Sequence, residues 1–144
     1  MPGTPETILA FDFGLRRIGV AVGQQITDSA SPLGIVRNDE NGPDWAGIGN
    51  FIREWRPARL IVGMPSHADG STSEIATVVR SFIGELGRFD LPIEAVDERY
   101  SSVEAEVRLK AQRKEGLRGR IRKEMIDAAA AVLIAERWLK NEHQ

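Results

Sequence analysis

Two apolar segments near the start of the chain are separated by only four residues, and this spacing is the feature that most constrains the fold. Residues 8–13 and 18–23 each have the length and composition of a β-strand, and Gly14 begins the short connection between them. Strands joined so closely must pair antiparallel, because a parallel pair needs a long crossover connection. The chain is therefore expected to begin with a β-hairpin.

Segments with strand and helix patterns alternate after this hairpin. Further strands are expected at 32–37, 60–63 and 92–98, and helices at 45–55, 71–86, from 101 onward and at 120–140. An antiparallel start followed by alternating helices and strands is typical of a mixed sheet covered by helices. We predict an α/β fold with a mixed five-stranded sheet flanked by helices, in a single domain of residues 1–144.

The composition excludes several kinds of protein. The chain has no cysteine, which rules out disulfides, thiolate catalysis and zinc sites of the cysteine type. Its first residues are polar, and its longest apolar run, at 128–135, is too short to span a bilayer. We therefore expect neither secretion nor membrane insertion, but a cytoplasmic location.

Basic residues are concentrated in one segment although the net charge is −2. Residues 108–123 contain eight basic residues and one acid, whereas the rest of the chain has 11 basic and 20 acidic residues. A local basic patch on an acidic protein is a candidate surface for nucleic acid, although a solvated helix surface would look the same. The candidates for nucleic-acid contacts are Arg16, Arg17, Arg108, Lys110, Arg113, Lys114, Arg118, Arg120, Arg122 and Lys123.

Three carboxylates occur at unusual places in this pattern. Asp12 is the only acid in the strand at 8–13, and Asp127 is the only charged residue in 125–135. Glu98 lies at the end of the last expected strand. Burying an unpaired carboxylate costs several kcal/mol, so such a group needs a proton, a basic partner or a metal ion. Each of these acids is therefore a candidate functional residue.

The residues alone leave two alternatives open. Asp12 could form an ordinary ion pair with Arg16 or Arg17. At the end of the last strand, Asp97 and Glu98 would point to opposite faces, so only one of them is expected to join a site.

Acids that meet at one edge of a sheet from separate elements suit Mg²⁺ or Mn²⁺, which prefer oxygen ligands. Two such ions about 4 Å apart can activate water and stabilise the leaving oxygen when a phosphodiester is hydrolysed. The small residues at 19–23 and 128–131 would let the last helix pack close to the sheet and bring Asp127 towards Asp12. The residues thus predict a metal-dependent nuclease.

Four groups of short motifs also resemble those of one family. In chain order they are 12–14 with 17–21 (DFG and RIGVA), 62–65 with 69–71 (VGMP and DGS), 97–99 with 101–102 (DER and SS), and 126–130 (IDAAA). Together they span nearly the whole chain in one order. This pattern resembles the YqgF (RuvX) proteins, which are described as Holliday-junction resolvases or as nucleases of the precursor of 16S ribosomal RNA.

The resemblance implies a ribonuclease-H-like fold with an Asp, Glu, Asp metal site, and it selects Glu98 over Asp97 to complete the set with Asp12 and Asp127. It also implies an endonuclease that processes the 5′ end of pre-16S rRNA, with ribosomal precursor particles as partners. Related resolvases carry a further acid three positions after the last aspartate, where this chain has Ala130. The number of metal ions is therefore left open.

Three other functions remain as alternatives. The chain could resolve branched DNA, or it could bind RNA in ribosome assembly without cutting it. An ATP-binding relative of actin and the sugar kinases is disfavoured, because those proteins need two such domains around the nucleotide. A monomer is favoured, although a resolvase that cuts two symmetric strands would be expected to dimerise.

Overall fold

The computed structural model describes residues 5–64, 74–97 and 123–142. Its strands form one six-stranded sheet in the order β4-β3-β2-β1-β5-β6. Strands β1, β2 and β3 pair antiparallel, and β5 and β6 run parallel to β1. The strand bounds are Thr7–Phe13 (β1), Arg17–Gln24 (β2), Ser29–Asp39 (β3), Gly42–Pro43 (β4), Arg59–Met64 (β5) and Ile93–Asp97 (β6).

The predicted mixed α/β fold is confirmed, with one strand more than the five expected. The additional strand, β4, has only two residues and pairs with the end of β3 across a turn in which the backbone N–H of Asn41 donates to Asp39 (2.8 Å). A two-residue strand has no room for a hydrophobic period, so no pattern in the sequence could indicate it.

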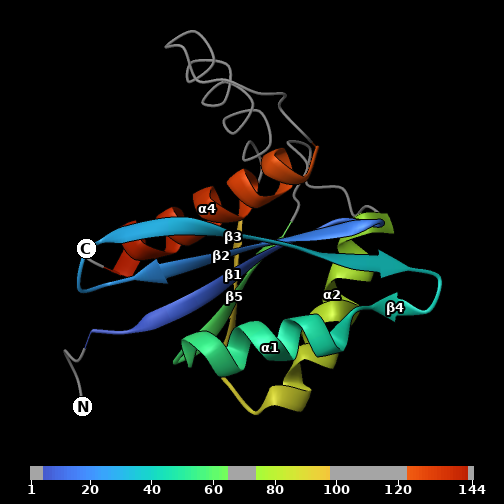
Figure 1. The fold of residues 1–144 in the computed structure, drawn as a ribbon, viewed down its shortest axis with the longest axis horizontal. Helices are drawn as coiled ribbons and strands as arrows, with labels where there is room; N and C mark the ends of the chain where they lie inside the picture. The colour runs from blue at the N-terminus through green and yellow to red at the C-terminus, as the bar shows by residue number, and fades with distance from the viewer. Residues whose placement is uncertain (1–4, 65–73, 98–122, 143–144) are drawn as a thin grey trace, which may run out of the picture.

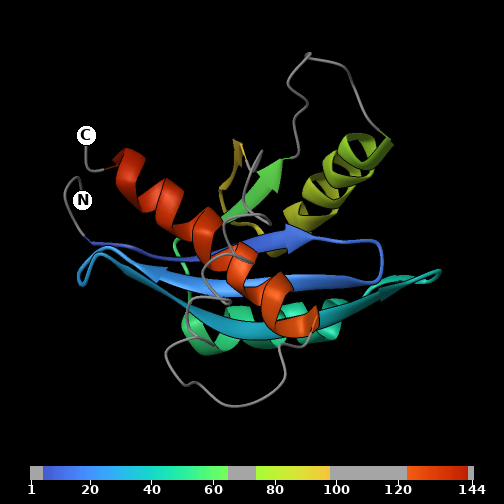
Figure 2. The same ribbon diagram turned by 90° about the horizontal axis from the view of Figure 1, so that it is seen from above.

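Helices cover both faces of the sheet. The long helix α4 (Lys123–Glu142) lies on one face, while α1 (Trp45–Trp55) and α2 (Glu74–Leu86) lie on the other (Figures 1 and 2). A single 3₁₀ turn, η1 (Gly87–Phe89), follows α2. The helix expected from residue 101 onward falls outside the described residues. No helix in the described part of the chain is long and apolar enough to cross a membrane.

The two faces of the sheet have different cores. Alternate residues of each strand, such as Leu9 and Phe11 of β1 and Val20 of β2, point to one face and pack with α1 and α2 into a large cluster. An aromatic group around Phe82 belongs to it, with ring centroids 5.1 Å from Phe13 and 5.7 Å from Trp45. This packing follows from the alternation of side chains along a strand, which puts Leu9, Phe11 and Phe13 of β1 on one face with the branched residues of β2.

The opposite face is built from smaller residues and is covered by α4. Ile8 and Ala10 of β1 pack there with Ile134, Ala135 and neighbouring residues of α4. A Cβ atom built on Gly23 of β2 would lie 3.4 Å from the Cβ of Ala135 and 2.9 Å from Cδ1 of Ile8. Glycine at this position therefore allows the close approach of α4 to β2.

Candidate functional site

Asp12 is the next-to-last residue of β1 and lies on the face that α4 covers. Its neighbours of the same parity, Ile8 and Ala10, pack against α4, whereas Phe11 and Phe13 pack on the opposite face. Asp12 is half-buried, and its partner in the antiparallel register is Gly19 of β2. Because β1, β5 and β6 are parallel, their carboxyl ends lie at the same edge of the sheet, which is the edge where Asp12 lies.

The contacts between α4 and β2 fix which part of the helix comes towards that edge. Ala131 packs against Ala21, and Ala135 lies next to Gly23, so the helix and the strand run in the same direction. Position 127 lies about one helical turn before Ala131, or about 6 Å along the helix axis. Gly19, the partner of Asp12, lies two residues before Ala21, or about 7 Å along β2.

The first turns of α4 and the strand end with Asp12 therefore lie at the same end of one sheet face. Asp127 is part of α4, but its side chain lies outside the described residues, as does Glu98. Within residues 5–64, 74–97 and 123–142, no three acidic or histidine side chains come together as a metal site.

The end of β6 is held to α4 by a side-chain contact. A guanidinium nitrogen of Arg137 donates a hydrogen bond to the backbone carbonyl of Asp97, the last residue of β6. Val96 packs in the cluster under α4, and the side chain of Asp97 is exposed. By alternation, Asp97 does not share the face of Asp12, which is evidence against Asp97 as a ligand at the same site.

A buried amide that sequence reasoning missed fixes the turn after Asp12. Asn38 of β3 is only 8% exposed, and its Nδ2 donates to the carbonyl of Gly14 (2.8 Å). The backbone N–H of Asn38 donates to the carbonyl of Arg16 (3.0 Å). A Cβ on Gly14 would lie 2.5 Å from the carbonyl oxygen of Arg17, so only glycine fits this tight turn. Polar residues near strand ends are usually exposed, and no signal in the sequence set Asn38 apart.

The two arginines of this turn differ in their surroundings. Arg16 is exposed, whereas Arg17, the first residue of β2, is half-buried. Its Nη1 is buried and has no hydrogen-bond partner among the described residues. Of the basic segment, Lys123 begins α4, although its side chain is not described. The seven other basic candidates, from Arg108 to Arg122, lie outside the described residues.

A hollow of about 230 Å³ lies on the other face of the sheet, between α2 and the hairpin of β3 and β4. Phe13, Leu15 and Val78 line it together with the acids Asp39 and Glu85. Because Phe13 and Asp12 are neighbours in one strand, they point to opposite faces, so this hollow is separate from the surroundings of Asp12.

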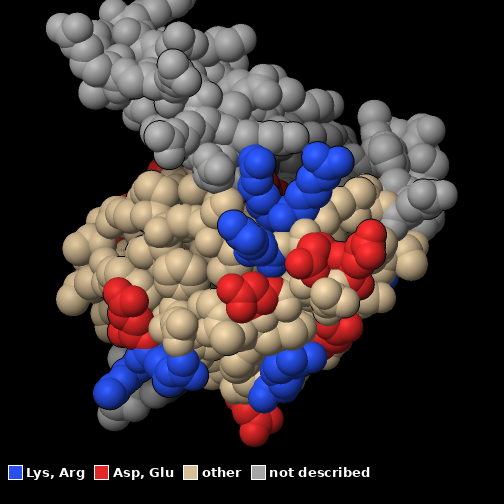
Figure 3. All heavy atoms as spheres, turned by 45° about the vertical axis from the view of Figure 1, so that its right-hand side comes forward, with Lys and Arg blue, Asp and Glu red and all other residues tan. Residues whose placement is uncertain are grey.

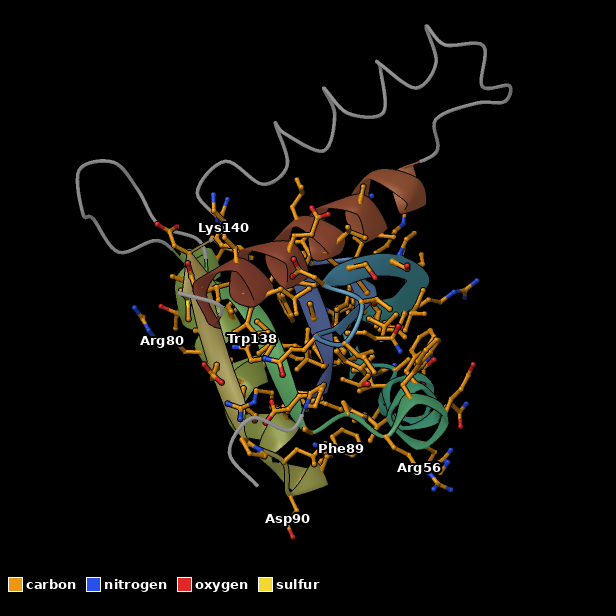
Figure 4. All side chains as sticks on the ribbon, turned by 90° about the vertical axis from the view of Figure 1, so that its left-hand side faces the viewer. Arg56, Arg80, Phe89, Asp90, Trp138 and Lys140 are labelled. Atoms are coloured by element: carbon orange, nitrogen blue, oxygen red, sulfur yellow. The ribbon has the colours of Figure 1, made fainter. Side chains whose placement is uncertain are left out.

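A charged network lies at the amino end of the parallel strands. The guanidinium of Arg59 bonds to Glu6 (2.7 and 3.0 Å) and to Glu94, and these hydrogen bonds raise the pKa of Arg59. The indole N–H of Trp138, a residue of α4 (Figure 4), donates to Glu94 (3.3 Å). The guanidinium of Arg59 lies over the Trp138 ring. Arg59 begins β5, so this network ties strands together far from the edge with Asp12.

Comparison with solved structures defines the class of fold. Thermus thermophilus RuvC, in a complex with a Holliday junction, is 18% identical in sequence over 95% of this chain and 95% of its own, with a TM-score of 0.56. The fowlpox virus resolvase in complex with Holliday junction DNA is 9% identical over 96% of this chain and 99% of its own, with a TM-score of 0.55. The chain thus has the ribonuclease-H-like fold of these resolvases.

Sequence comparison identifies the family. A protein of Paraburkholderia xenovorans is 44% identical over 95% of this chain and 90% of its own length, and one of Burkholderia lata is 46% identical over 92% of this chain and 88% of its own length. Both carry the name "Putative pre-16S rRNA nuclease". The RuvX family, described as Holliday junction resolvase, matches residues 6–141. The chain belongs to the RuvX family and is a nuclease, an enzyme that hydrolyses phosphodiester bonds.

Proposed function

We propose that this nuclease is a divalent-metal-dependent endonuclease that processes the 5′ end of pre-16S rRNA during ribosome biogenesis in the cytoplasm. The observation that carries the proposal is the register of α4 on β2, which brings position 127 to the end of the sheet face where Asp12 lies. The names of the relatives that are 44% and 46% identical support the RNA substrate and ribosomal precursor particles as partners.

In this proposal Asp12, Glu98 and Asp127 hold Mg²⁺ or Mn²⁺. The described part of the site fits such an ion, because Asp12 supplies a half-buried carboxylate and its cross-strand partner Gly19 has no side chain to fill the space beside it. Metal ions bound there would supply an activated water and charge stabilisation for the leaving oxygen. The family resemblance and the exposed position of Asp97 both favour Glu98 as the third ligand.

The protein's own cations position the nucleic acid in this proposal. Arg16 and Arg17 follow Asp12 in the turn that Asn38 holds, and they contact backbone phosphates next to the site. The basic residues at 108–123 add affinity that depends strongly on salt and carries little sequence preference. Recognition of the cleavage site then depends on the shape of the RNA.

Cleavage of a 5′-extended pre-16S RNA by purified protein with Mn²⁺, Mg²⁺ or chelator tests the proposal. We expect metal-dependent cleavage that Asp12→Asn and Asp127→Asn each abolish, because a neutral amide binds a divalent cation much more weakly than a carboxylate. Asp28→Asn is the matched control. Asp28 is exposed at the opposite end of β2 and has a positive φ of 51°, which asparagine tolerates well.

Cleavage that persists in chelator, or in both site variants, would contradict the proposed metal site. Loss of cleavage in the control Asp28→Asn as well would trace the effect to folding rather than to metal binding, and unfolding midpoints of the variants separate these cases.

Resolution of branched DNA is the second candidate, because the family description names Holliday junction resolvase. A four-way DNA junction in the same assay decides between the substrates: faster cutting of the junction than of the precursor RNA would favour this candidate.

A non-catalytic RNA-binding role in ribosome assembly is the third candidate. It is favoured by Ala130, which is buried beside Leu133 at the position where related resolvases carry a further acid. Normal 16S rRNA maturation in cells that carry only the Asp12→Asn variant would support this role and exclude catalysis by the proposed site.

A further inference from the structure

Two arginines lie directly opposite each other on the sheet face that carries Asp12. In the antiparallel pairing of β2 with β3, Arg17 is the partner of Arg37, and the adjacent pair is Ile18 with Val36. Ile18 and Val36 both pack in the core with α1 and α2. By alternation, Arg17 and Arg37 are both on the opposite face, the face of Asp12 and α4.

This arrangement lacks the partners that usually stabilise it. Directly opposite side chains have Cβ atoms about 5 Å apart, and like charges at that separation destabilise a sheet. Neither Arg17 nor Arg37 has an acidic partner within the described ranges, and Nη1 of Arg17 is buried there without an acceptor. A guanidinium cannot lose its charge at neutral pH, so a buried N–H of Arg17 stays a charged donor, and leaving it without an acceptor costs free energy. Both features would be relieved by one anion bound between the two arginines.

The position of the pair relative to Asp12 indicates which anion it would bind. Asp12 is opposite Gly19, and Arg17 is two residues away from Gly19 on the same strand and face, a diagonal separation of about 7 Å. Asn38, next to Arg37, holds the turn that leads into Arg17. Basic side chains gather at this end of the described surface, with acidic ones beside them (Figure 3).

We propose that Arg17 and Arg37 form a phosphate clamp that binds one backbone phosphate of the nucleic-acid strand next to the phosphodiester that is cut. The guanidinium groups present paired N–H donors that match phosphate oxygens, which gives the clamp geometric as well as electrostatic selectivity for phosphate. The identity of the bound strand rests on the proposed function, whereas the anion site itself rests on the register of the two arginines and on the buried Nη1 of Arg17.

Arg37→Gln tests the clamp, and Arg80→Gln is its matched control. Both changes remove one arginine charge, but Arg80 is exposed on α2, on the other side of the sheet (Figure 4). Binding of the 5′-extended pre-16S RNA is measured in chelator, which prevents metal-dependent cleavage, over a series of salt concentrations. We expect Arg37→Gln to bind about tenfold more weakly at moderate salt, and to make the plot of log K against log salt less steep by about 0.7–0.9.

A second readout needs no nucleic acid. Inorganic phosphate, compared with chloride at equal ionic strength, should raise the Tm of the wild type and of Arg80→Gln, but not that of Arg37→Gln. In phosphate-free buffer Arg37→Gln should be at least as stable as the wild type, because it removes a like-charge pair. Arg37→Lys, which keeps the charge but lacks the paired donors, should show an intermediate loss of binding.

Equal affinity, equal salt dependence and equal phosphate stabilisation in Arg37→Gln and Arg80→Gln would overturn the clamp. This outcome is distinguishable from failure of the proposed function. If Asp12→Asn abolishes cleavage while Arg37→Gln binds as the wild type does, the clamp is wrong and the metal site stands. If no metal-dependent cleavage occurs but Arg37→Gln loses phosphate stabilisation and RNA affinity, the clamp stands and the catalytic proposal fails.

Discussion

Replacing Asn38 tests how the turn next to Asp12 is held in place. Asn38→Ala removes the donor to the Gly14 carbonyl, a 2.8 Å hydrogen bond from a residue that is only 8% exposed. The lost hydrogen bond is worth about 1 kcal/mol, and the half-buried Gly14 carbonyl left without this donor costs about 1 kcal/mol more. We therefore expect the free energy of unfolding to fall by about 2 kcal/mol.

The assay is urea unfolding, with Asn50→Ala as the matched control. Asn50 is exposed on α1, where alanine is a better helix former, so the control should change stability by less than about 0.5 kcal/mol. Cleavage, measured well below the unfolding midpoint, should also fall in Asn38→Ala, because the turn follows Asp12 directly and carries Arg16 and Arg17. A displacement of about 1 Å at a catalytic site can cost about 100-fold in rate.

Asn38→Asp makes the same argument testable by pH. The introduced carboxylate would face the Gly14 carbonyl with an oxygen in place of the N–H donor, and burial there raises the pKa of this carboxyl above its unfolded value. The variant should therefore be less stable than the wild type above the unfolded pKa, and should recover as the pH falls through the raised pKa and the protonated group donates again. Identical urea midpoints for Asn38→Ala and Asn50→Ala, or a pH-independent deficit in Asn38→Asp, would refute the reasoning.

Two further predictions concern the rest of the framework. Gly23→Val should lower the free energy of unfolding by about 2 kcal/mol and reduce cleavage, because the valine side chain would collide with Ile8 and displace α4. Gly84→Ala on α2, where an added Cβ meets nothing within 4 Å, should instead raise the free energy of unfolding by about 0.5–1 kcal/mol. Urea unfolding of both variants checks these values. Arg59→Gln should lower the free energy of unfolding by about 1 kcal/mol at low salt and by less in 1 M salt, because it breaks a partly exposed charged network. Cleavage should change little, because this network is remote from Asp12. Unfolding at the two salt concentrations and a cleavage assay test these expectations.

The sheet and its helices could be predicted where burial leaves a period in the sequence. The alternation in 18–23 is visible because branched residues face α1 and α2 while small ones face α4. Strand β3 shows the limit of this approach. It was expected at 32–37 but extends over Ser29–Asp39. Its ends could not be predicted, because many of its side chains are exposed and leave no hydrophobic period.

The candidate site was predictable only in part. Asp12 and Asp127 stand out because a charge in an apolar run is conspicuous in the sequence. The contact of Asn38 and the proposed role of Arg37 are not visible there, because each depends on a partner about 20 residues away across the sheet: Gly14 for Asn38 and Arg17 for Arg37. The choice between Asp97 and Glu98 came from the family resemblance, and the exposed side chain of Asp97 agrees with it.

The small residues under α4 explain why the proposed site lies at this edge rather than along the whole helix. Where Ala131 meets Ala21 and Ala135 meets Gly23, the backbones approach closely, and water and substrate are excluded. One turn earlier on the helix the pattern changes from Ala131 to Asp127, while the strand continues with Gly19. The space that Gly19 leaves lies beside Asp12, and in the proposed site the carboxylate of Asp127 would border it in place of an alanine methyl group. The same close packing that excludes substrate over most of α4 thus fixes the position of the first turns, where the proposed oxygen ligands and the phosphate would meet.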